Sequence, residues 1–136
     1  PTLQAIRRHN DWPRIEHIME RLLACGNIHL HLDLIVGLPY EDFGRLRQSF
    51  NDIYALRPHK LQIGFLKLLK GSGIRRDYGG DYRYDPQGPY EVLETTWLPY
   101  ERVRYMKEPI IRENLPVFCP MYPESTPGII LLCTKA

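Results

Sequence analysis

The chain has 136 residues and a mass of 16.0 kDa, and 43% of its residues are hydrophobic, so it has the size of one domain and can bury a core. Its formal charge of +2 comes from 18 basic and 16 acidic side chains scattered along the sequence, which argues against nucleic acid as a partner. No apolar run approaches the roughly 20 residues that cross a bilayer, and no signal-peptide core precedes residue 12, so we expect a cytoplasmic protein without a membrane partner.

The first two predicted elements differ in the period of their apolar residues. Residues 11–25 have apolar side chains at helical spacing, with Asn10 or Asp11 as a candidate cap and Gly26 as a stop, and they predict an amphipathic helix. From Ile28 to Val36 the period changes to two, which predicts a strand with two different faces.

A second helix and a second strand follow with short connections. Residues 41–56 carry an apolar stripe, and Glu41 and Asp42 suit the positive first turn of a helix, which Pro58 ends. Leu61–Leu69 then predicts another strand. This helix-strand-helix-strand order indicates an α/β fold with a parallel sheet and right-handed crossovers, whose strands need neighbours on both sides.

The character of the sequence changes after Lys70. Glycines and tyrosines replace the clean periodicity, and we expect a long, irregular segment with a short helix near residues 99–108. The remainder is rich in proline before a strand-like run at Ile129–Leu132. We therefore divide the chain into residues 1–70, built from βα units, and residues 71–136, an accessory extension that is irregular and proline-rich after 108.

One face of the first predicted strand carries three ionisable side chains: His29, His31 and Asp33. A buried parallel strand is usually apolar on both faces, so this face should look into a polar, ligand-lined space. The lumen of a TIM-like parallel barrel supplies such a space, and active sites lie at the carboxyl ends of its strands. Asp33 lies four residues before the strand break at Gly37.

These residues resemble the late strands of radical S-adenosylmethionine (SAM) barrels. The resemblance rests on the run His31 to Pro39 (HLDLIVGLP), the helix that follows, the stretch Gly64 to Ser72 (GFLKLLKGS) and Pro89 to Leu93 (PYEVL). It covers roughly residues 1–107 and is strongest for oxygen-independent coproporphyrinogen III oxidases and cobalamin-binding-domain radical SAM proteins. It implies that the chain is the C-terminal portion of such a barrel, and that the missing N-terminal portion is its partner.

The resemblance also implies roles for two positions. Asp33 would contact the ribose of SAM, and the backbone around Lys67 would line the SAM pocket. A carboxylate suits vicinal hydroxyls because it accepts two hydrogen bonds in one plane. Lumen packing or hydrogen bonding to a substrate is the expected role of His29 and His31.

The cysteines do not fit the iron-sulfur cluster of this family. Cys25, Cys119 and Cys133 are too far apart for the three clustered ligands of a 4Fe-4S site, so those ligands should precede Pro1. Their odd number and wide spacing also argue against disulfides and a CxxC zinc site, and predict buried, small apolar side chains.

The leading hypothesis is therefore the SAM-binding part of a radical SAM iron-sulfur oxidoreductase that reductively cleaves SAM, with cobalamin as a further cofactor to test in the parent. One alternative is a metal-dependent barrel hydrolase that uses His29 and His31 as ligands. Another is a non-catalytic fragment that self-associates through open sheet edges and an incompletely covered apolar strand face.

Overall fold

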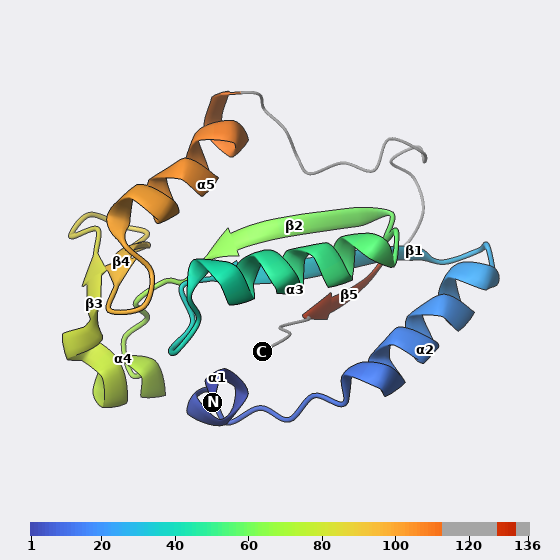
Figure 1. The fold of residues 1–136 in the computed structure, drawn as a ribbon, viewed down its shortest axis with the longest axis horizontal. Coiled ribbons are helices and arrows are strands. Elements are labelled where there is room, and N and C mark those ends of the chain that lie inside the picture. The colour runs from blue at the N-terminus through green and yellow to red at the C-terminus, as the bar shows by residue number, and fades with distance from the viewer. Residues whose placement is uncertain (113–127, 133–136) are drawn as a thin grey trace.

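The computed structural model describes residues 1–112 and 128–132, with the end of the last helix and the final strand described by their backbone (Figure 1). The strands form a three-stranded parallel sheet in the order β2-β1-β5 and a separate antiparallel pair, β3-β4. In chain order the elements are α1 (Thr2–Ala5), α2 (Trp12–Ala24), β1 (His29–Val36), α3 (Phe43–Ala55), β2 (Lys60–Phe65), α4 (Gly73–Tyr78), η1 (Gly79–Asp81), β3 (Tyr82–Tyr84), β4 (Val92–Thr95), α5 (Tyr100–Arg112) and β5 (Gly128–Leu132).

The two central helices both begin after an aspartate cap: Asp11 is one of the two caps expected from the sequence, whereas Asp42 was expected in the first turn of its helix. Asp11 Oδ1 accepts a hydrogen bond from the Arg14 N–H at 3.3 Å, and Asp42 Oδ1 accepts one from the Arg45 N–H at 2.9 Å. Each bond satisfies a backbone donor that has no partner within its helix. The predicted helices at 11–25 and 41–56 are therefore confirmed as α2 and α3, which are one or two residues shorter at each end.

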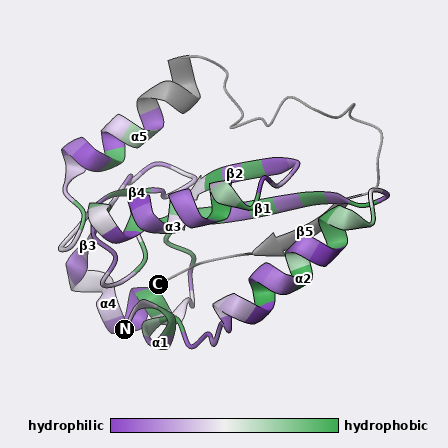
Figure 2. Cartoon of the chain, turned by 45° about the vertical axis from the view of Figure 1, so that its right-hand side comes forward, coloured by the Kyte–Doolittle hydropathy of each residue, from purple (hydrophilic) through white to green (hydrophobic). Residues whose placement is uncertain are grey.

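Strand β1 alternates between buried and half-buried residues along its whole length. Leu30, Leu32, Leu34 and Val36 are buried completely or nearly so, and they form one core with Met19 of α2 and with Leu46 and Ile53 of α3. Both helices thus cover the same face of the sheet. In Figure 2 green apolar segments and purple hydrophilic ones alternate along these elements. The expectation that this strand face is incompletely covered is wrong, because α2 and α3 together cover it.

The sheet is open. Among the described residues, β1 is the central strand, with β2 and β5 at the two edges, and these strands do not close into a barrel. The α/β class and the parallel pairing of β1 with β2 agree with the predicted βα units, and the run at 129–132 is confirmed as part of a strand. A right-handed crossover with its helix on one face is the repeating unit of parallel barrels.

Strand β2 ends four residues before the predicted limit at Leu69. The Leu66 N–H still donates to the Val36 carbonyl at 3.0 Å, but the Leu66 carbonyl accepts from the Val92 N–H at 2.8 Å, and Lys67 forms an antiparallel bridge with Glu91. The chain therefore leaves the parallel sheet at this point, because its backbone groups pair with the segment around β4.

The segment after Lys70 is more regular than the sequence predicts. It contains α4, η1 and the β3-β4 pair, and the predicted helix at 99–108 is observed as α5, which continues through Pro109 to Arg112. The β3-β4 register shifts between Arg83 and Tyr84, an irregularity that disturbs the alternation by which strands are predicted. The proline-rich run at 113–127 lies outside the described residues.

Candidate functional site

A tight turn follows the carboxyl end of β1. Gly37 has a φ of +94°, and a Cβ added to it would lie 2.9 Å from Val92 Cγ1, so only glycine fits both the backbone and the space. Leu38 and Pro39 are buried behind it. The turn packs β1 against β4 and fixes where the polar face of β1 ends.

Asp33 lies on the polar, half-buried face of β1. It pairs in register with Gln62 of β2 and Leu132 of β5, so it sits across the middle of the sheet. Within the described part of the chain its carboxylate has no hydrogen-bond or ion-pair partner, and its charge partly opposes the lowering of the His31 pKa by burial. This carboxylate is available to accept hydrogen bonds from a ligand.

Lys67 lies in a cleft of about 320 Å³ that runs along β2. The walls come from β2, from the segment that pairs with Lys67, and from α5; the lining residues are Gln62, Ile63, Gly64, Phe65, Lys67, Glu91 and Lys107. The Lys107 ammonium lies 3.1 Å from Glu91 Oε2 and 4.7 Å from the centre of the Phe65 ring. Gln62, the register partner of Asp33, brings the polar face of β1 next to this cleft.

The histidines gather near the amino ends of β1 and β2. The His29 ring centre lies 4.6 Å from that of His31 and 4.8 Å from that of His59, which directly precedes β2. His59 Nδ1 accepts a hydrogen bond from the Leu30 N–H at 3.0 Å. Since a strand rises about 3.3 Å per residue, Asp33 lies about 13 Å along β1 from His29. The structure therefore places the histidines near the amino ends of β1 and β2, Asp33 near the middle of β1, and Lys67 beyond the carboxyl end of β2.

Burial and neighbouring positive charge lower the pKa of two of these imidazoles. Burial, His29 and Lys60 hold the pKa of His31 below its ordinary value, and burial and His29 do the same for the pKa of His59. The described residues contain no group of three or more His, Cys, Asp or Glu side chains placed to hold a metal ion. The bond from Leu30 also occupies the ring nitrogen of His59 that faces β1.

Glu41 is a buried acid that the sequence analysis assigned to the first turn of a helix. The structure places it before the cap, with only 2% of its surface exposed. Burial and the adjacent Asp42 raise its pKa to about 8, against the smaller opposing effects of Arg45 and a hydrogen bond from the Leu38 backbone. Its Oε2 has no hydrogen-bond partner among the described residues. In the sequence, the feature that could have indicated this buried acid is a glutamate directly after the turn that ends a buried strand.

Aromatic rings surround this end of β1. The Tyr40 ring lies 4.8 Å from the ring of Trp97 and 5.9 Å from that of Tyr78, and the Tyr82 ring lies 6.2 Å from Trp97. Burial raises the pKa of Tyr82, and its hydroxyl, like Glu41 Oε2, is buried without a described partner. The carboxyl end of β1 therefore combines a neutral acid, a phenol and an aromatic wall.

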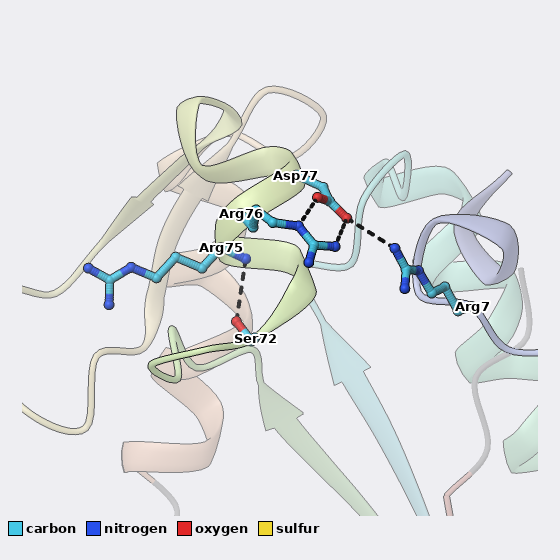
Figure 3. A network of polar contacts seen from close by, with 5 residues as sticks. All are labelled: Arg7, Ser72, Arg75, Arg76 and Asp77. Atoms are coloured by element: carbon cyan, nitrogen blue, oxygen red, sulfur yellow. Dashed lines mark hydrogen bonds and ion pairs between the residues drawn. The ribbon is translucent and has the colours of Figure 1, made fainter.

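The glycine- and serine-containing loop after Lys70 has a structural role. Ser72 Oγ accepts a hydrogen bond from the Arg75 N–H at 3.3 Å and so caps α4 (Figure 3). Asp77 in the same helix lies 2.6 Å from Arg76 Nε and 3.8 Å from the Arg7 guanidinium, which ties α4 to the segment after α1. The hydrogen bond from Arg76 holds the pKa of Asp77 below its usual range.

The cysteine prediction is wrong for Cys25. This residue is an exposed, free thiol at the C-cap of α2, so it is not a buried apolar side chain. Cys119 and Cys133 lie outside the described residues. The described part of the chain also contains no helix that is both long and apolar enough to cross a membrane.

Comparison with known proteins gives one informative similarity. Over 96 residues, 68% of this chain, the sequence is 29% identical to the oxygen-independent coproporphyrinogen-III oxidase-like protein HemZ of Bacillus subtilis (strain 168). The matched residues make up 18% of that protein, so the chain spans less than a fifth of its curated relative. No family model matches the chain, and no solved structure matches it significantly.

Proposed function

We propose that this chain is the SAM-binding part of a radical SAM iron-sulfur oxidoreductase of the oxygen-independent coproporphyrinogen III oxidase-like type. The observation that carries the proposal is the polar face of β1, where the Asp33 carboxylate has no described partner. The similarity of the sequence to an oxygen-independent coproporphyrinogen-III oxidase-like protein supports it. The α2-β1-α3-β2 segment, with helices on one face only, supports a place in a parallel barrel.

In this proposal Asp33 holds the ribose of SAM and the backbone near Lys67 forms the adjoining wall. A carboxylate accepts both hydroxyl hydrogen bonds in one plane, and the cleft beside Gln62 provides room next to it. His29 and His31 face the same space nearer the amino end of the strand, where they pack or contact a substrate. Residues 1–70 form the barrel units, and residues 71–136 form the accessory extension.

The residues described here do not fit the iron-sulfur cluster. The one described cysteine, Cys25, is exposed at the end of α2, on the far side of the core from the polar face of β1. The cluster, which would supply the electron for reductive cleavage of SAM, must therefore be held by another part of a cytoplasmic parent protein. Cobalamin is not part of the proposal, because neither the described residues nor the relative's name points to it.

The test uses the complete parent protein, loaded with its cluster, and measures SAM binding by calorimetry. Asp33→Ala should weaken binding roughly ten- to a hundredfold, since losing a charged acceptor costs about 1.5–3 kcal/mol. Asp33→Asn keeps one acceptor oxygen and should lie between Ala and wild type. His29→Ala is the matched control on the same strand face, and it should change SAM binding less than threefold.

Two outcomes contradict this assignment. If Asp33→Ala binds SAM as tightly as wild type while circular dichroism shows an intact fold, Asp33 does not contact SAM. If His29→Ala weakens binding as much as Asp33→Ala, the effect reflects the whole strand face rather than one carboxylate.

A further inference from the structure

Strand β5 lies next to β1 in the position where the strand of a preceding βα unit would be expected. It pairs in parallel with β1 from His29↔Gly128 to Asp33↔Leu132, on the side of β1 opposite to β2 (Figure 1). It has five residues, and its sequence neighbour among the described elements, α5, ends 16 positions earlier at Arg112. The edge of β1 is therefore closed by a short strand from the far end of the chain.

The handedness of parallel units identifies the strand that would otherwise lie there. In a right-handed crossover with all helices on one face, each successive strand is added on the same side of the preceding one. Helix α2 covers the same face as α3, and α3 leads from β1 to β2. A strand connected to β1 through α2 would then lie next to β1 on the side away from β2, which is the place of β5.

The backbone parity of β1 shows which groups β5 covers. The Val36 carbonyl and the Leu30 N–H point toward the β2 side, because they bond to the Leu66 N–H and to His59 Nδ1. Backbone direction alternates along a strand, so the even-numbered residues of β1 face β2. The odd-numbered residues, including His31 and Asp33, turn their N–H and carbonyl groups toward β5.

We propose that β5 is an exchangeable strand, which closes the β1 edge in this chain and gives way to the parallel strand of a preceding βα unit. The surface is the edge formed by the backbone of His29, His31 and Asp33, and the partner it fits is a parallel strand connected through α2. This inference does not require that the chain binds SAM. An edge left open would otherwise be a template for pairing with other chains.

Hydrogen exchange of the wild-type chain, followed residue by residue by NMR, tests whether β5 opens separately. At low denaturant the amides of His31 and Asp33 should exchange at least about tenfold faster than those of Leu32 and Leu34, because only the former lose partners when β5 leaves. Equal exchange at all four amides would overturn the proposal, since β5 would then open only with the whole sheet.

Two proline variants provide a matched pair within β5. By the same parity and the observed register, the Leu131 N–H points toward β1 and the Ile130 N–H points away from it. Leu131→Pro should therefore release β5 and expose the His31 and Asp33 amides, whereas Ile130→Pro should leave them protected. Retained protection of Leu32 and Leu34 in Leu131→Pro verifies that the rest of the sheet is folded.

A fluorescent peptide with the sequence of residues 124–132 tests whether the edge accepts a strand in trans. A tethered β5 competes at an effective concentration of the order of millimolar, so micromolar peptide should not bind wild type or Ile130→Pro. Leu131→Pro should bind it at least about tenfold more tightly than Ile130→Pro does, by fluorescence anisotropy. Equal binding to both variants, or protection of His31 and Asp33 that survives Leu131→Pro, would refute the proposal.

Discussion

Replacing Glu41 with Gln should make the stability of this chain less sensitive to pH. In the folded chain burial and Asp42 raise the pKa of Glu41 to about 8, from an ordinary value of 4.5. The folded state therefore holds this proton over a pH range in which the unfolded state has released it. For such a group the free energy of unfolding falls as pH rises from 4.5 to 8 and levels off above 8.

The expected size follows from the separation of the two pKa values. Each pH unit between them changes the free energy of unfolding by about 1.4 kcal/mol, so wild type should lose on the order of 2.5 kcal/mol between pH 5 and pH 7. Glutamine matches the shape of the protonated acid and can accept the hydrogen bond from the Leu38 backbone. Glu41→Gln should therefore equal wild type near pH 5 and exceed its stability at pH 7.

Urea unfolding followed by circular dichroism at pH 5, 6, 7 and 8 measures this difference. Glu101→Gln, which removes an exposed carboxylate from α5, is the control and should follow the wild-type curve. The reasoning is refuted if wild type and Glu41→Gln lose stability in parallel between pH 5 and pH 8. It is also refuted if Glu101→Gln removes the pH dependence, because the effect would then come from net charge.

Three further perturbations test other contacts. His59→Ala should cost about 1–1.5 kcal/mol in urea unfolding, because the Leu30 N–H loses its acceptor, whereas His59→Asn should recover part of this. Because burial and His29 lower the pKa of the His59 imidazole, the stability of wild type relative to His59→Asn should fall as pH drops below 6.5, whatever Glu41 contributes to both proteins, and a difference that does not change with pH would contradict this. Gly37→Ala should lower the free energy of unfolding by roughly 2–3 kcal/mol, through backbone strain and the clash with Val92. Gly26 also has a positive φ, +69°, but open space around it, so Gly26→Ala should cost only about 1 kcal/mol. Equal losses in the two variants would exclude the clash. Anaerobic reconstitution of this chain with iron and sulfide should give no stoichiometric 4Fe-4S absorption, and a cluster at one per chain would contradict the proposal that its ligands lie elsewhere.

Local patterns were sufficient to predict the elements around β1. The alternation from Ile28 to Val36 and the cap at Asp11 depend on side chains within a few residues of one another. Asp42, which was expected in the first turn of its helix, is instead the cap of α3. The burial of Glu41 was harder to predict from the sequence, because a glutamate at this position also suits the exposed first turn of a helix. Its position before the cap depends on how the turn after Gly37 packs against Val92, more than fifty residues later.

By itself the sequence determined that β1 has one apolar and one ionisable face, because the period of two that sorts side chains is written in consecutive residues. It also determined that helices and strands alternate along the first part of the chain, an order that is typical of a parallel sheet. Only the tertiary structure decided that both helices cover the apolar face completely, that His59 joins His29 and His31 near the amino ends of β1 and β2, and that β5 closes the edge of β1. These features join residues up to about a hundred positions apart, and such pairings depend on the competition between packing and chain entropy, which no local pattern records.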